Sequence, residues 1–129
     1  MYPTTCIPTK RSKLEWLAKH DEFVSNCSNL TIDTVFIGDS IFANFNRREH
    51  NDIWVKYFSN TSLNLSIKGD RVEHALWRVL NGEVPKSAKK VFILIGTNNV
   101  SQSNPDDIAA GIINLVRAIK SKANSCVCT

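Results

Sequence analysis

The sequence has no long hydrophobic run: no stretch approaches the roughly 20 apolar residues that a membrane-spanning helix needs. Its N-terminus lacks the basic start and the apolar stretch of a signal peptide. It also has no internal repeat and no low-complexity segment. We therefore expect a cytoplasmic protein without a membrane span.

Cysteines are few, and the sequence contains no motif for a bound cofactor. In a chain without a secretory signal, four cysteines are expected to be free thiols rather than a disulfide framework. The spacing of Cys126 and Cys128 is weak evidence for a metal. Neither a G-x-G-x-x-G sequence nor a P-loop is present, which disfavours a nucleotide-binding domain. We expect no cofactor and no metal.

Positive charge is in small excess but is not concentrated. The formal net charge is +4, and basic pairs such as Arg47-Arg48 and Lys89-Lys90 are scattered. A nucleic-acid-binding protein usually carries a basic stripe or a known module, so we expect no nucleic-acid partner. The chain has 129 residues, of which 43% are hydrophobic and 22% charged, as in an ordinary globular domain.

Hydrophobic patterns predict alternating strands and helices after an irregular arm over residues 1–11. The predicted strands are 34–37, 63–65 and 91–95, and residues 125–129 are expected to begin a fourth. Helices are predicted over 12–25 and 52–58, from Asp70 to a C-terminal Gly82, and from an N-cap at Asn104 followed by Pro105. This order favours an α/β fold with a parallel sheet.

Two of these helices begin with a capping-box pattern, Ser12–Glu15 and Asp70–Glu73. Each also has a predicted buried face. The face of the first helix contains Leu14, Leu17 and Val24, that of the second Val72, Leu76, Val79 and Leu80, and that of the last helix Ile108, Ile112, Leu115, Val116 and Ile119.

Three unusual loops follow the predicted strands. The first contains Ser40, the second Gly69 and the third Asn98. Ligands of open parallel sheets bind outside the carboxyl ends of the strands, so these residues are expected to meet at one site. A hydroxyl beside two neutral donors is suited to acyl transfer. Taken singly, each residue could instead serve as a helix cap or a turn residue.

The same loops resemble the conserved blocks of the SGNH (GDSL-type) hydrolases. Val35–Ser40 is similar to the first block, Gly69-Asp70 to the second and Gly96–Asn99 to the third. The stretch His74–Glu83 resembles the type Ib platelet-activating-factor acetylhydrolase branch of that family. The resemblance covers about residues 30–120.

The resemblance implies a flavodoxin-like three-layer α/β/α sandwich with strand order 2-1-3-4-5. It implies Ser40 as the nucleophile, with the Ser40 and Gly69 N–H groups and the Asn98 side chain as the oxyanion hole. It further implies no metal, a small ester or acetylated lipid as substrate, and a homodimer or heterodimer of related subunits. Ser66 and Lys68 depart from glycines of close relatives, and Lys68 either alters the approach to the oxyanion hole or is solvated.

The family's fourth block, Asp-x-x-His, which supplies the base and its orienting acid, does not occur in the sequence. We expect His20 and His50 to be solvated, and His74 to be a packed or surface helix residue rather than a replacement base. Residues 12–129 would then be an SGNH-like domain without its C-terminal part, truncated after the third or fourth strand.

An incomplete sheet would leave strand 91–95 at an edge, or covered only by residues 125–129. We therefore expect either a fragment of a longer protein or a chain that needs a partner. Two functions follow: a serine ester hydrolase, or a non-catalytic binding or assembly subunit that pairs with a full-length homologue.

Overall fold

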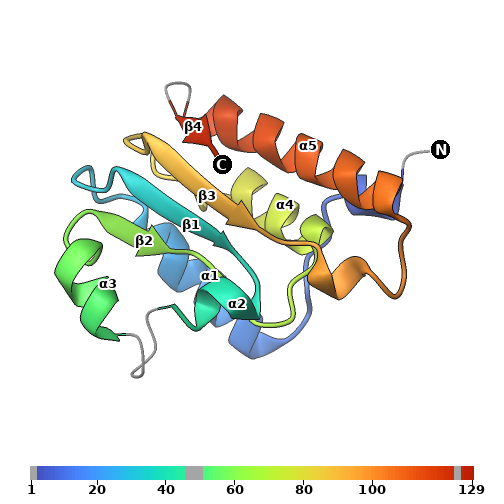
Figure 1. Cartoon of the computed structure of the whole chain (residues 1–129), viewed down its shortest axis with the longest axis horizontal. Coiled ribbons are helices and arrows are strands. Elements are labelled where there is room, and N and C mark those ends of the chain that lie inside the picture. Colours follow the sequence, from blue (N-terminus) through green and yellow to red (C-terminus); the bar gives the residue numbers. More distant parts are fainter. Residues whose placement is uncertain (1–2, 46–50, 124–125) are drawn as a thin grey trace.

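The centre of the molecule is a parallel sheet, and the computed structural model describes residues 3–45, 51–123 and 126–129. The strands lie in the order β2-β1-β3-β4 (Figure 1). They are β1 (Thr34–Gly38), β2 (Ser62–Asn64), β3 (Lys90–Leu94) and β4 (Val127–Cys128). All pairings are parallel, which confirms the predicted α/β class and strand order.

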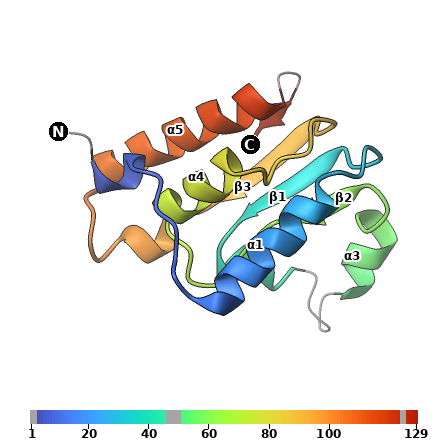
Figure 2. The same cartoon turned by 180° about the vertical axis from the view of Figure 1, so that it is seen from behind.

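Helices cover the sheet on both faces. They are η1 (Thr4–Cys6), α1 (Leu14–Asn26), α2 (Ser40–Ala43), α3 (Asn51–Tyr57), α4 (Val72–Leu80), η2 (Thr97–Asn99) and α5 (Pro105–Lys122). Helices α1, α4 and α5 lie over one face (Figure 2). Helix α2 lies on the other side (Figure 1). None of the helices in the described part of the chain has the length and hydropathy to span a membrane.

Alternation along the strands builds a separate core on each face of the sheet. Val35, Ile37 and Val91 belong to the main core, which includes buried side chains of α1, α4 and α5. On the other face, the ring of Phe36 lies 5.1 Å from that of Phe92 and 5.8 Å from that of Trp54 in α3. Because β1 is buried on both faces, its sequence is a continuous apolar run.

Helix α1 differs from its prediction in both its start and its buried face. It begins at Leu14, and its N-cap residue Lys13 makes no side-chain capping bond, so the Ser12–Glu15 capping box does not form. Leu14 is 82% exposed, whereas Trp16, His20 and Phe23 are buried. Their spacing of four and three residues is equally helical, but aromatic rings and a histidine occupy it instead of leucines.

Two other predicted helix boundaries are confirmed. The Asn104 side chain accepts a hydrogen bond from the Asp107 N–H at 2.9 Å, and Pro105 is the first residue of α5. Gly82 follows the C-cap of α4 with a φ of 111°, a left-handed conformation that favours glycine. The predicted face of α4 is wrong at Leu80, which is exposed.

The N-terminal segment is more ordered than the predicted irregular arm. It contains η1, whose Thr5 is buried and donates its hydroxyl to the Asp107 carbonyl of α5. Gly111 makes this contact possible, because a Cβ there would lie 2.8 Å from the Cβ and the carbonyl oxygen of Thr5. The segment therefore packs on α5 where that helix has no side chain.

The contact at Gly111 predicts an unusual effect of Gly111→Ala. Alanine normally stabilises a helix interior by about 0.5–1 kcal/mol relative to glycine. Here its methyl group overlaps Thr5, so we expect a net loss of about 1 kcal/mol. Urea unfolding measures the difference, with the exposed Ala109→Gly in the same helix as the reference for helix propensity alone. A stabilised Gly111→Ala variant would contradict this packing.

The outer edge of β3 is only partly paired, as expected. The Val127 N–H of β4 donates to the Lys89 carbonyl, and the Thr129 N–H donates to the Val91 carbonyl. The Ile93 N–H in turn donates to the Thr129 carbonyl. β3 continues to Leu94, beyond Val91, the last of its residues that pairs with β4. A groove of about 230 Å³ lies here, and Leu94 is 39% exposed.

Candidate active site

Strand pairing brings the three predicted loops to the same end of the sheet. Gly38 at the end of β1 pairs with Leu94 at the end of β3. On the other side, the Ile67 N–H donates to the Gly38 carbonyl at 3.1 Å and extends the pairing of β2 with β1. Each loop therefore begins beside Gly38, which confirms that the loops converge.

Ser40 is placed by a turn that ends β1 and starts α2. Asp39, which is buried, caps this helix by accepting a hydrogen bond from the Ile41 N–H at 3.0 Å. Ser40 is the first residue of α2 and is half-buried. Ser40 therefore lies just beyond the end of β1, partly accessible to solvent instead of buried in the core.

Gly69 lies in a tight turn between Ile67 and Asp70. The Asp70 N–H donates to the Ile67 carbonyl at 3.2 Å, and the φ of Gly69 is 85°. This value matches the third position of a type II turn, where glycine is favoured. Gly69 is exposed, so its backbone is accessible to a ligand.

Asn98 lies in η2, directly after β3. Its Nδ2 donates to the Asp70 carbonyl at 2.8 Å. The neighbouring Asn99 is buried; its Oδ1 accepts from the Val72 N–H, and its Nδ2 donates to Glu73 at 2.8 Å. The two asparagines therefore attach the loop after β3 to the Gly69 turn and to the start of α4.

A groove of about 940 Å³ has Ser40 and Gly69 in its wall. Asn98 is not part of that wall; its amide is held at Asp70, the residue after Gly69. Arg11 and Lys68 add positive charge to the groove. The Lys68 side chain is exposed, which agrees with the solvated alternative of the prediction.

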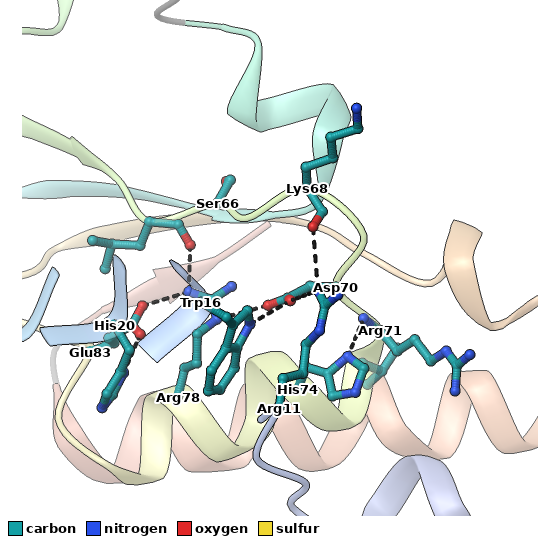
Figure 3. Close-up of polar contacts among 12 residues, drawn as sticks. Arg11, Trp16, His20, Ser66, Lys68, Asp70, Arg71, His74, Arg78 and Glu83 are labelled. Carbon is teal, nitrogen blue, oxygen red and sulfur yellow. Dashed lines mark hydrogen bonds and ion pairs between the residues drawn. The ribbon is translucent and has the colours of Figure 1, made fainter. Parts of the chain in front are cut away.

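Beneath the Gly69 turn lies a buried ionic cluster, shown in Figure 3. The Asp70 carboxylate is 0% exposed and accepts from Arg78 Nε at 2.9 Å and Trp16 Nε1 at 2.8 Å. Arg11 Nη1 is 3.1 Å from the same carboxylate. Arg78, itself 1% exposed, also donates to Glu83 and to the Leu65 carbonyl. Two carboxylates thus share one buried guanidinium.

Two predictions are corrected by this cluster. Asp70 does not begin a capping box, because α4 starts at Val72 with Arg71 as its N-cap and the Asp70 carboxylate is turned to Arg78. His20 is not solvated: it is 7% exposed and its Nδ1 is hydrogen-bonded to Glu83. Burial raises the pKa of Glu83, despite the nearby Arg78 charge. The only sign of this buried cluster in the sequence was Arg78, a charged residue next to the apolar face of α4.

The described histidines are both occupied by structural contacts. His74 Nδ1 accepts from the Arg71 N–H at 2.9 Å, and burial lowers the pKa of His74. A neutral ring with an occupied Nδ1 carries its proton on Nε2, so it has no free lone pair to act as a base. His74 is therefore a packed helix residue, as predicted. The prediction for His50 lies outside the described residues.

None of the four cysteines lines the groove that contains Ser40. They are free thiols, as predicted. Burial raises the pKa of the Cys27 thiol to about 12, so it stays protonated. The sulfur atoms of Cys126 and Cys128 are 3.9 Å apart. Within the described ranges, no three His, Cys, Asp or Glu side chains form a group that could hold a metal ion.

Comparison with curated proteins finds relatives over most of the chain. The platelet-activating factor acetylhydrolase IB subunit beta homolog of Drosophila melanogaster is 35% identical over 120 residues, which are 92% of this chain and 52% of that protein. The alpha2 subunit of Gallus gallus is 37% identical over 109 residues, which are 83% and 46% of the two proteins. The chain thus spans about half the length of these relatives.

Solved structures share the fold. A proposed acylhydrolase from Bacteroides fragilis superposes with a TM-score of 0.66 at 19% identity, over 84% of this chain and 54% of that one. A Streptococcus pneumonia protein, proposed to be a platelet activating factor, gives a TM-score of 0.63 at 19% identity, over 87% and 53%. No protein-family model matches the sequence.

The parallel sheet and the sequence relatives agree in class: the chain is a partial homologue of SGNH hydrolases. In particular, it is a homologue of the catalytic subunits of platelet-activating factor acetylhydrolase IB, over about half of their length. The resemblance read from the sequence is thereby confirmed.

Proposed function

We propose that this chain carries the nucleophile and the oxyanion hole of a serine ester hydrolase. The supporting observation is the convergence of three loops at Gly38, which brings Ser40 and Gly69 to one groove and attaches Asn98 to the Gly69 turn. The proposed substrate is a small ester, such as the acetyl group of a lipid like platelet-activating factor. Homology to acetylhydrolases supports this substrate class.

In the proposed reaction, Ser40 Oγ attacks the carbonyl carbon of the ester. The N–H groups of Ser40 and Gly69 and the Asn98 amide stabilise the oxyanion of the tetrahedral intermediate. The C–O bond to the alcohol then breaks, and the alcohol leaves with the serine proton. Water hydrolyses the acyl-serine, releasing the carboxylic acid and restoring the hydroxyl.

The serine proton needs a base, and neither His20 nor His74 offers one. His74 Nδ1 already accepts from the Arg71 N–H. His20 is buried against the rings of Trp16 and Trp77 and does not line the groove that contains Ser40. The family resemblance implies an Asp-x-x-His arrangement for this role, and the sequence does not contain one. A serine hydroxyl without such a base is a weak nucleophile. The chain by itself should therefore react slowly.

The test supplies the base from solution. The chain is incubated with p-nitrophenyl acetate and free imidazole, and Ser40→Ala gives the rate due to imidazole alone. We expect faster release of nitrophenol from the wild-type chain, and an intact mass that is larger by one acetyl group located on Ser40. Equal rates together with an unmodified Ser40 would exclude this function for the chain.

The open edge of β3 favours a second candidate, a non-catalytic assembly subunit that forms a dimer with a full-length homologue. Ile93, Leu94 and Ile95 border the groove beside Thr129, and β3 extends beyond the residues that pair with β4, as at an edge that can add another strand. Size-exclusion chromatography of the chain mixed with a full-length homologue tests it. A joint peak without imidazole-dependent chemistry at Ser40 would favour this candidate.

A further inference from the structure

Asp70 contacts the rest of the molecule through both its side chain and its backbone carbonyl. The carboxylate accepts hydrogen bonds from Trp16, Arg78 and Arg11, which come from α1, α4 and the segment before α1. The carbonyl accepts from Asn98 Nδ2 at 2.8 Å. Figure 3 shows the carboxylate among these donors, beneath the turn that carries Lys68.

We propose that Asp70 is a positioning residue for two donors of the oxyanion hole, the Gly69 N–H and the Asn98 amide. This inference rests on the proposed function. The Gly69 N–H is fixed because the residue after it is held at three points, and the Asn98 amide is fixed because it bonds to the Asp70 carbonyl. One residue thus sets two donors that come from different strand ends.

The bond to Asn98 determines which end of the amide faces the substrate. A backbone carbonyl accepts only a donor, so it selects Nδ2 and turns Oδ1 away. One Nδ2 proton is used in this bond, which leaves the other for the oxyanion. A freely rotating amide would present its oxygen part of the time, and that oxygen repels a developing negative charge.

Burial of the cluster supports a role beyond stability. A buried ion pair adds little net stability compared with apolar residues of similar size. Asp70 and Arg78 are nevertheless almost fully buried, directly beneath the exposed Gly69. Charge-assisted bonds are short and directional, so they hold the turn in one geometry. Glu83 and His20 lie at the other end of the cluster, beyond Arg78.

This arrangement provides a matched pair of variants, Asp70→Asn and Glu83→Gln. Each removes one buried carboxylate charge bonded to Arg78, so both should lower stability. Only Asp70→Asn alters the bonds at the Gly69 turn. By charge alone, loss of a carboxylate near the oxyanion would favour the reaction. A fall in rate therefore reports the position of the donors.

Two readouts test the proposal on the full chain. With p-nitrophenyl acetate and imidazole, we expect Ser40 acetylation to fall at least tenfold in Asp70→Asn and to stay within about threefold of wild type in Glu83→Gln. In NMR spectra without substrate, we expect Asp70→Asn, but not Glu83→Gln, to shift the Gly69 N–H and to reduce the separation of the two Asn98 Nδ2 proton signals.

Equal losses of acetylation in the two variants, or unchanged Gly69 and Asn98 signals in Asp70→Asn, would overturn the proposal. The NMR readout needs no chemistry at Ser40. An unreactive wild-type chain whose Asn98 signals still change in Asp70→Asn would reject the proposed function and keep the positioning role of Asp70.

Discussion

Replacing Arg78 with methionine is expected to lower the free energy of unfolding by about 3–5 kcal/mol, because a broken buried ion pair leaves its partner uncompensated. Arg78 is 1% exposed and donates to Asp70, Glu83 and the Leu65 carbonyl. Methionine fills similar volume but donates nothing. Urea unfolding at pH 7.5 measures the loss.

Arg117→Met is the matched control, since Arg117 lies exposed on α5. We expect it to change stability by no more than about 0.5 kcal/mol. Similar losses in the two variants would show that the buried contacts of Arg78 add nothing to the free energy of unfolding.

The Arg78→Met deficit should also depend on pH. The pKa of Glu83 already lies above its ordinary 4.5 because of burial, and loss of the Arg78 charge raises it further. A carboxyl with a raised folded-state pKa contributes stability that is present below pH 4.5 and is lost as the pH rises through that pKa. The deficit should therefore be smaller at pH 5 than at pH 8, as paired unfolding curves would show.

Gly38→Ala is expected to destabilise the chain by about 1–3 kcal/mol, the usual range for an overpacked core. A Cβ at Gly38 would lie 2.4 Å from the Leu94 carbonyl oxygen and 3.1 Å from the Phe42 ring. The first neighbour is backbone of β3, which no change of rotamer can move. The two strands must therefore separate at the end that carries Ser40.

Urea unfolding together with hydrogen exchange at Leu94 and Ile95 tests this prediction. We expect faster exchange at these amides in Gly38→Ala and no change in Ser40→Ala, which alters the same turn without adding atoms. A Gly38→Ala variant within about 0.5 kcal/mol of wild type, with unchanged exchange, would contradict the close approach of β1 and β3.

Local patterns predicted most of the elements because each one depends on neighbouring residues. The continuous apolar run that starts at Val91 predicts the strand β3, and the Asn104-Pro105 pair marks the start of α5. The capping box at Asp70 was wrong because a buried guanidinium eight residues away bonds the carboxylate. A partner at that distance along the chain has no local signature.

The place of the candidate site could be predicted because Ser40, Gly69 and Asn98 each follow a strand. Parallel strands end at one edge of the sheet. The cluster behind the site was not. His20 was expected to be solvated, yet Glu83 and the rings of Trp16 and Trp77 surround it. Trp16 lies one turn earlier in α1, whereas Trp77 and Glu83 come from α4 and the loop after it.

The sequence by itself therefore determined the α/β class, because hydrophobic periodicity acts over a few residues. The strand order followed from the family resemblance that the loop motifs carry. Only the tertiary structure decided which charges are buried, that η1 packs on Gly111, and that Asp70 joins the Gly69 turn to Asn98. The physical reason is that desolvation and ion pairing depend on all the groups around an atom, and the fold collects those groups from distant parts of the chain.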